Sequence, residues 1–267
     1  MSRTAVVCTD SSALLTEHDV ARLGIEVVPI GIVLDGELAQ GDLDPDGFYA
    51  WLAAGVTVAT SQPSPAEFAT VYAAAAAARG ARSVISIHLD ERVSGTAASA
   101  EIAAREAPIP VHVVATGTVS FGVGICARAA AEALAAGASP RAATTLARRL
   151  GSTVRNVFVA PGAPGGRVSQ PAGWTLLVFA DGETRPLATC DGAVEAVGLM
   201  VEHILASGQP IRAAVGHAAA VSEPAADDLA AKLASSASVR ELERYRVGPA
   251  VGAHTGPFSL GAFWWPS

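Results

Sequence analysis

The chain contains few charged residues, one lysine and three cysteines, and each of these low counts argues against particular classes of protein. Only 16% of its 267 residues are charged, the formal net charge is −7, and Lys232 is the one lysine. Binding nucleic acid requires a concentrated basic surface that neutralises phosphates, so this balance argues against a nucleic acid partner. The three cysteines, Cys8, Cys126 and Cys190, lack metal-ligand spacing, and their odd number argues against a disulfide framework.

Long apolar runs and targeting segments are also missing. No stretch approaches the roughly 18–20 apolar residues that a membrane-spanning helix needs. The apolar run that follows the first four residues (AVVC) is too short for the hydrophobic region of a secretory signal peptide. We therefore expect a cytoplasmic protein without a transmembrane segment, in which free thiols stay reduced.

The common signatures of catalysis and cofactor binding are absent as well. The sequence has no nucleophile elbow, Walker loop, zinc-binding pattern or dinucleotide fingerprint. The glycine-rich residues 161–167 (PGAPGGR) do not have the spacing of a phosphate-binding loop. These absences indicate a protein that needs no cofactor and holds no metal.

What the sequence does contain is three short runs of hydroxyl, glycine and proline residues, far apart in the chain. They are residues 60–64 (TSQPS), 94–96 (SGT) and 252–257 (GAHTGP). Side chains this small and polar add little to a core. The first two runs precede helix starts, where free backbone N–H groups beside short hydroxyls can bind an anion. The competing interpretation is that all three are turns and helix caps without a ligand.

Strand and helix patterns alternate up to residue 150. Ser64 and Glu67 form a capping box with Pro65 at the first helical position, which predicts a helix from there to Gly80. Strands predicted at residues 5–8, 83–88 and 111–114 are each followed by polar residues and a helical pattern. This alternation predicts a parallel sheet with helices on both faces, in which ligands bind beyond the carboxyl ends of the strands.

The pattern changes after Leu150. Residues 174–179 and 185–189 flank Asp181 and Gly182, which is a hairpin signature, and Asp191 precedes a long amphipathic helix. Hairpins mixed with long helices predict a second α/β domain with a mixed sheet. We expect one domain over residues 1–152, a second over residues 153–267, and a ligand cleft between them.

Four single polar residues, one of them inside the third run, have surroundings that bear on a possible role. His254 lies between Gly252 and Gly256, where we expect bent backbone, and an anion-binding role is favoured over a structural one. Arg167 follows two glycines, and arginine pairs carboxylates in a bidentate way. Asp10 belongs to a turn or orients the hydroxyls after it, and the turn is favoured. His88 ends a strand shortly before the Ser94 run, and a structural role is favoured over one in which it reaches that run.

Taken in order, five motifs resemble the DegV family. They are residues 9–12 (TDSS), 60–64 (TSQPS), 94–96 (SGT) followed by Ser99 and Ala100, 165–168 (GGRV) and 252–257 (GAHTGP). The resemblance extends from residue 5 to about residue 263. It implies two α/β domains that bind one long-chain fatty acid between them. Several members of that family are the binding subunit of a bacterial fatty acid kinase. The binding subunit presents the carboxylate to a separate kinase subunit and has no nucleotide site of its own.

Carried over residue by residue, the resemblance implies that Thr60 and Ser94 hold the carboxylate, with Ser61 and Gly95 nearby. His254 and Arg167 would complete the polar network. The chain departs from the family at residues 160–164 (APGAP), where a leucine-bearing helical turn is usual, and at residues 115–117 (ATG), where Asp-Ser is usual.

Two other functions stay open from the sequence. In the first, the chain is a small-molecule hydrolase or transferase that uses His254 as acid or base with a nearby hydroxyl as nucleophile. In the second, the altered loop before Arg167 has closed the pocket, and the chain is an interaction module.

Overall fold

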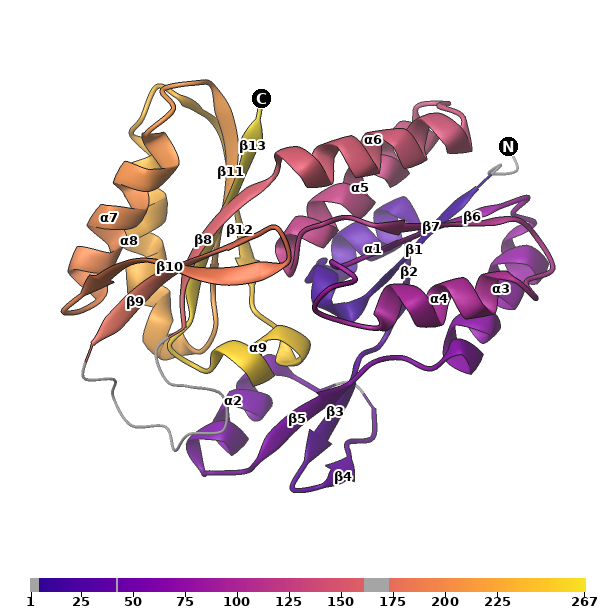
Figure 1. The fold of residues 1–267 in the computed structure, drawn as a ribbon, viewed down its shortest axis with the longest axis horizontal. Coiled ribbons are helices and arrows are strands. Elements are labelled where there is room, and N and C mark those ends of the chain that lie inside the picture. The colour runs from indigo at the N-terminus through magenta and orange to yellow at the C-terminus, as the bar shows by residue number, and fades with distance from the viewer. Residues whose placement is uncertain (1–4, 42, 161–172) are drawn as a thin grey trace. The chain divides into compact units, whose positions relative to one another are not determined.

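The computed structural model describes residues 5–41, 43–160 and 173–267 (Figure 1). These residues form two compact units. The first takes in the chain up to Gly31 together with Ser61–Thr153, and the second takes in Ile32–Thr60 and the chain from Val154 onward. The domain boundary expected from the sequence, between residues 152 and 153, assigns residues 32–60 to the first domain. In the structure this segment lies in the second unit, where the hydroxyl of Tyr49 donates to the carbonyl of Val247 at 3.0 Å.

The first unit is built on a parallel sheet with the strand order β2-β1-β6-β7. Its strands are β1 (Val6–Asp10), β2 (Glu26–Val28), β6 (Val84–His88) and β7 (Val111–Ala115). Its helices are α1 (Glu17–Leu23), α3 (Pro65–Arg79), α4 (Thr96–Ala104), α5 (Phe121–Ala135) and α6 (Pro140–Thr153). The predicted parallel sheet is confirmed.

Each face of this sheet is covered by helices, because buried strands are apolar on both sides. Val6 and Cys8 point to one face and pack with Phe68 and Tyr72 of α3. Val7 points to the other face and packs with the apolar sides of α5 and α6. Helices on both faces therefore hold the strands in place, and the polar residues that follow the strands are attached to a well-packed sheet.

The helix that follows the first hydroxyl run begins where the capping box predicts. The Ser64 hydroxyl accepts a hydrogen bond from the backbone N–H of Glu67 at 3.3 Å, and the Glu67 carboxylate accepts one from the N–H of Ser64 at 2.7 Å. At the far end Gly80 takes a left-handed conformation with φ of 59°. Both signals are local, so they operate whatever the helix packs against.

The second unit contains a mixed sheet with the strand order β10-β9-β8-β13-β11-β12 and a small sheet with the order β4-β3-β5. The strands of the mixed sheet are β8 (Arg155–Val159), β9 (Trp174–Ala180), β10 (Glu183–Cys190), β11 (Ile211–His217), β12 (Val239–Arg246) and β13 (Leu260–Pro266). The small sheet has β3 (Gly31–Leu34), β4 (Glu37–Leu38) and β5 (Val58–Ser61). The helices are α2 (Pro45–Ala53), α7 (Ala193–Leu205), α8 (Glu223–Ala234) and α9 (Pro249–Thr255).

Helices α7 and α8 bury their apolar sides against the mixed sheet. Met200 and Ile204 of α7 and Leu229 and Leu233 of α8 are fully buried in this core. The hairpin predicted around Asp181 and Gly182 is confirmed, since β9 and β10 pair antiparallel. No helix in the described part of the chain is long and apolar enough to cross a bilayer.

The start of α7 differs from the expectation that Asp191 caps it. The residue before the helix is Gly192, which makes no side-chain cap. The Glu195 carboxylate reaches back and accepts from the backbone N–H of Asp191 at 2.8 Å. The Asp191 carboxylate therefore does not cap the helix, which begins one residue later than the sequence predicts.

Two of the cysteines should be unreactive in the folded protein. Burial raises the pKa of the Cys8 and Cys126 thiols to about 12 each, which lowers their thiolate fraction at every pH below that value. We expect iodoacetamide at pH 8 to label both at least about 100-fold more slowly in the folded chain than in urea, because only thiolates react. Peptide mass spectrometry over a time course measures this. Fast labelling of Cys8 in the folded chain would show that the α3 face of the sheet opens.

Candidate functional site

Two residues from opposite ends of the chain meet in the second unit. Thr60 lies near the end of β5, His254 lies in the last turn of α9, and the Thr60 Oγ1 is 2.9 Å from the His254 Nε2. The two positions are 194 residues apart in sequence. The structure therefore brings together two of the residues that the hydroxyl runs single out.

His254 is held by a short helix rather than by the bent backbone that its neighbouring glycines suggest. Pro249 occupies the first turn of α9, and Gly256 ends the helix with φ of 78°. Gly252 allows α9 to lie against α2, because a Cβ at this position would collide with the Tyr49 hydroxyl and come within 3.1 Å of the Phe48 ring. The glycine is there for close helix packing, and the expectation of bent backbone at Gly252 is wrong.

The bond between Thr60 and His254 determines what the threonine hydroxyl can do. If the Nε2–H of His254 donates to Thr60 Oγ1, the threonine keeps its own proton free to donate elsewhere. A hydroxyl in that state is a hydrogen-bond donor aimed at an acceptor, and a carboxylate is the strongest acceptor in common ligands.

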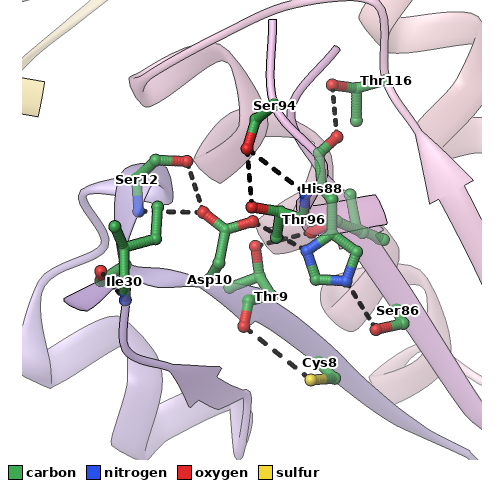
Figure 2. Close-up of polar contacts among 12 residues, drawn as sticks. Cys8, Thr9, Asp10, Ser12, Ile30, Ser86, His88, Ser94, Thr96 and Thr116 are labelled. Atoms are coloured by element: carbon green, nitrogen blue, oxygen red, sulfur yellow. Dashed lines mark hydrogen bonds and ion pairs between the residues drawn. The ribbon is translucent and has the colours of Figure 1, made fainter. Parts of the chain in front are cut away.

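The second hydroxyl run lies at the start of α4 in the first unit. The Ser94 Oγ accepts from the backbone N–H of Thr96 at 3.3 Å and lies 2.9 Å from the Thr96 Oγ1 (Figure 2). Gly95 is the residue before the helix and makes no side-chain cap. The arrangement puts the Ser94 hydroxyl beside the positive end of a helix, where a negative group is favoured.

Gln62 connects the first run to the second, a link that the sequence analysis missed. Its Nε2 donates to the Ser99 Oγ at 3.2 Å, and its carboxamide occupies the space that a Cβ at Gly95 would need. Glycine at position 95 lets this carboxamide approach the backbone of the turn. The only available signal was the hydrogen-bonding side chain between Ser61 and Pro63, which does not specify a partner.

The loop between β6 and Ser94 is tightened by Asp90. This side chain is 2% exposed and accepts from the backbone N–H and the Nε of Arg92, each at 2.9 Å. The hydrogen-bonding Arg92 side chain lowers the pKa of the Asp90 carboxyl, against the opposing effect of burial. The backbone N–H of Asp90 donates to the carbonyl of Thr118 at 2.9 Å, so the loop is also tied to the segment after β7.

His88 has the structural role that the sequence favours, and it does not contact the Ser94 run. It is fully buried, with its Nδ1 2.7 Å from the Asp10 Oδ2 and its Nε2 2.7 Å from the Ser86 Oγ (Figure 2). Asp10 also accepts from the hydroxyl and the backbone N–H of Ser12, so it does orient a hydroxyl. Serine, histidine and aspartate follow one another as in a hydrolase, but Ser86 is completely buried and no substrate can reach it.

The site residues predicted from the sequence therefore fall into three groups. Thr60 and His254 are in contact in the second unit, and Ser61 follows Thr60 as the last residue of β5. Ser94 and Gly95 belong to one turn in the first unit. Arg167 lies outside the described residues.

Two α/β units, one built on a parallel sheet and the other containing a mixed sheet, define the class of the protein. The chain belongs to the DegV family, since the family model described as "Uncharacterised protein, DegV family" matches residues 4–267. The five motifs predicted this membership, and it is confirmed.

Relatives of similar length cover nearly the whole chain. A DegV domain-containing protein of Streptomyces coelicolor is 35% identical over 278 aligned positions, which cover 98% of each chain. A DegV family protein from Thermus thermophilus, whose structure is described as showing fatty acid binding, is 28% identical with a TM-score of 0.88 and covers 99% of this chain and 100% of its own. DegV from Bacillus subtilis, described as a fatty acid binding protein, is 26% identical with a TM-score of 0.84 over the full length of both chains.

Proposed function

We propose that this chain binds one long-chain fatty acid and has no chemistry of its own. Thr60 and Ser94 donate hydrogen bonds to the carboxylate, Ser61 and Gly95 contribute beside them, and His254 and Arg167 complete the polar network. The observation that carries the proposal is the hydrogen bond between Thr60 and His254. It joins two motifs in a chain whose solved relatives include proteins described as fatty acid binding.

The energetics of such a ligand suit polar turns combined with an apolar interior. A carboxylate taken out of water needs several hydrogen bonds, each worth roughly 1.5–3 kcal/mol when one partner is charged. The acyl tail gains about 0.8 kcal/mol for each buried methylene, so a long tail gains on the order of 10 kcal/mol before ordering costs. The hydroxyls thus select the acid group, while the tail supplies most of the affinity.

We further propose that the chain works in the cytoplasm as the binding subunit of a fatty acid kinase. In this role it presents the carboxylate to a separate kinase subunit, which supplies the nucleotide and the phosphoryl transfer. The absence of a phosphate-binding loop from the sequence is consistent with this division of work.

Mass spectrometry of bound lipid tests the binding function directly. The purified chain is denatured and extracted, and a parallel sample is titrated with palmitate and oleate. We expect a stoichiometric fatty acid in the extract, or saturable binding of at least one added acid. An empty protein that binds neither acid would contradict the proposal.

A hydrolase or transferase is the second candidate, because a hydroxyl bonded to a histidine is also how a nucleophile is activated. In the described residues no carboxylate is paired with His254, whereas a catalytic histidine is commonly oriented by one. Turnover of an ester or phosphate substrate that disappears in the variant His254→Ala would favour this candidate.

Arg167 provides a test of the kinase role. We expect Arg167→Ala to lower the rate of kinase-dependent acyl phosphate formation by at least about tenfold, because a hydrogen bond from a charged group is worth roughly 1.5–3 kcal/mol. The affinity for the fatty acid should fall by less, since we expect Arg167 to act mainly during transfer. The rate is measured with a bacterial fatty acid kinase subunit and ATP, and the affinity by calorimetry. Arg141→Ala, at an exposed position of α6, is the control. Equal losses of rate and affinity would place Arg167 in the binding pocket.

A further inference from the structure

A continuous chain of buried hydrogen bonds crosses the first unit beneath its hydroxyl turns. The Tyr72 hydroxyl of α3 lies 2.8 Å from the Ser86 Oγ, which lies 2.7 Å from the His88 Nε2. The His88 Nδ1 lies 2.7 Å from the Asp10 Oδ2, and the other carboxylate oxygen accepts from Ser12 (Figure 2). The side chains of His88 and Asp10 are 0% exposed.

The chemistry of Asp10 determines the direction of these bonds. An ionised carboxylate only accepts, so the Nδ1 of His88 must carry the proton that it shares with Asp10. In a neutral His88 the Nε2 then accepts from the Ser86 hydroxyl, and Ser86 in turn accepts from Tyr72. Asp10 receives donors from His88 and from the hydroxyl and backbone N–H of Ser12, which is how a buried carboxylate is satisfied.

The two central residues stand where the turns begin. Asp10 is the last residue of β1 and leads into Ser11 and Ser12, while His88 is the last residue of β6 and leads through the Asp90 loop to Ser94. The backbone carbonyl of His88 also accepts from the N–H and the hydroxyl of Thr116, at 3.0 and 2.9 Å. The bond between Asp10 and His88 therefore joins the ends of β1 and β6, and the His88 carbonyl joins them to Thr116, directly after β7.

We propose that Asp10 and His88 are positioning residues that hold the turn at Ser12 and the turn from Ser94 to Thr96 in their binding geometry. Neither residue touches the ligand. The expected effect on fatty acid affinity rests on the proposed function, whereas the positioning of the turns does not. Hydroxyl donors act at full strength only when their own supports are fixed, so a loosened strand end misplaces the donor.

Two substitutions of His88 separate its two bonds. The amide nitrogen of asparagine in His88→Asn takes the place of Nδ1 and can still donate to Asp10. The longer His88→Gln places its amide toward Ser86 and loses Asp10. Tyr72→Phe is the matched control, since it removes the outer bond to Ser86 and leaves the pair of Asp10 and His88 intact.

The first readout is amide hydrogen exchange of Ser12 and Thr96 in the ligand-free protein, which does not depend on any ligand. We expect faster exchange at both amides in H88Q and unchanged exchange in H88N and Y72F. The second readout is the palmitate Kd, expected to rise about tenfold in H88Q and less than about twofold in H88N and Y72F, because a donor shifted by a fraction of an ångström loses much of its bond.

Unchanged exchange in H88Q, or an equal rise in Kd in H88Q and Y72F at equal loss of stability, would overturn the inference. If the wild-type chain binds no acid, the proposed function fails, and the exchange readout still decides the positioning role. If H88Q does not fold, the variant Asp10→Asn is used in its place. The asparagine amide would donate to the Nδ1 of His88, and the proton of the imidazole would then move to Nε2. The ¹⁵N spectrum of the ring reports that move, and an imidazole that keeps its Nδ1 proton would contradict the bond.

Discussion

Replacing Thr60 by valine and Ser94 by alanine together is expected to weaken fatty acid binding by at least about 100-fold, since each lost hydrogen bond to a charged carboxylate is worth roughly 1.5–3 kcal/mol. Each substitution removes a hydroxyl, and with it the bond of Thr60 to His254 or the bonds of Ser94 to Thr96. Valine keeps the β-branched shape that suits Thr60 at the end of β5. The protein should therefore remain folded while the affinity for palmitate falls.

The measurement is a calorimetric titration with palmitate, beside a urea unfolding curve for each variant. The control is the pair Thr145→Val and Ser235→Ala, which removes two exposed hydroxyls. That of Thr145 donates to a backbone carbonyl within α6, and that of Ser235, directly after α8, donates to a carbonyl in the last turn of α8. We expect the control to bind like the wild type. An affinity that is unchanged in the T60V/S94A variant would place the carboxylate at another part of the chain.

The second large effect is expected at Gly252, where alanine should lower the free energy of unfolding by about 1–3 kcal/mol, the usual cost of overpacking. The added methyl group would collide with the Tyr49 hydroxyl and approach the Phe48 ring to 3.1 Å. Both rings are buried, so neither can move aside freely. The variant should also bind palmitate more weakly, because α9 carries His254 away from Thr60.

Urea unfolding of G252A measures the loss, and G198A provides a matched control. Gly198 also lies inside a helix, α7, but a Cβ there meets nothing within 4 Å. Alanine is the better helix former by about 1 kcal/mol, so G198A should stabilise the protein. If G252A proves as stable as the wild type, Tyr49 yields to the methyl group, and Gly252 is not there for packing.

Some features of this protein follow from neighbouring residues alone. The capping box of Ser64 and Glu67 and the left-handed Gly80 mark both ends of α3, because each signal operates within one helical turn. The apolar strands and the alternation with helices likewise determine the parallel sheet of the first unit. The hairpin at Asp181 and Gly182 is marked by its turn residues and by the apolar strand β9 before them.

Local patterns were insufficient where a side chain from elsewhere decided the outcome. The glycines around His254 are typical of a bent loop, yet contact with Tyr49 and Phe48 makes Gly252 part of a packed helix. At Asp191 the sequence favours a capping carboxylate, but Gly192 precedes the helix without a side-chain cap, and the Glu195 carboxylate accepts from the N–H of Asp191. At Gly252 the pattern had two physical uses, and a neighbour in space selected one.

The sequence by itself determined the fold class, the family and the candidate hydroxyls, because composition, periodicity and ordered motifs are properties of short segments. The tertiary structure alone decided which of these groups meet: Thr60 with His254 across 194 residues, and Asp10 with His88 across 78. Such pairs depend on strand order and helix packing, which result from many weak contacts between distant parts of the chain. No single segment of the sequence contains these contacts, so the pairing can be seen only in the folded protein.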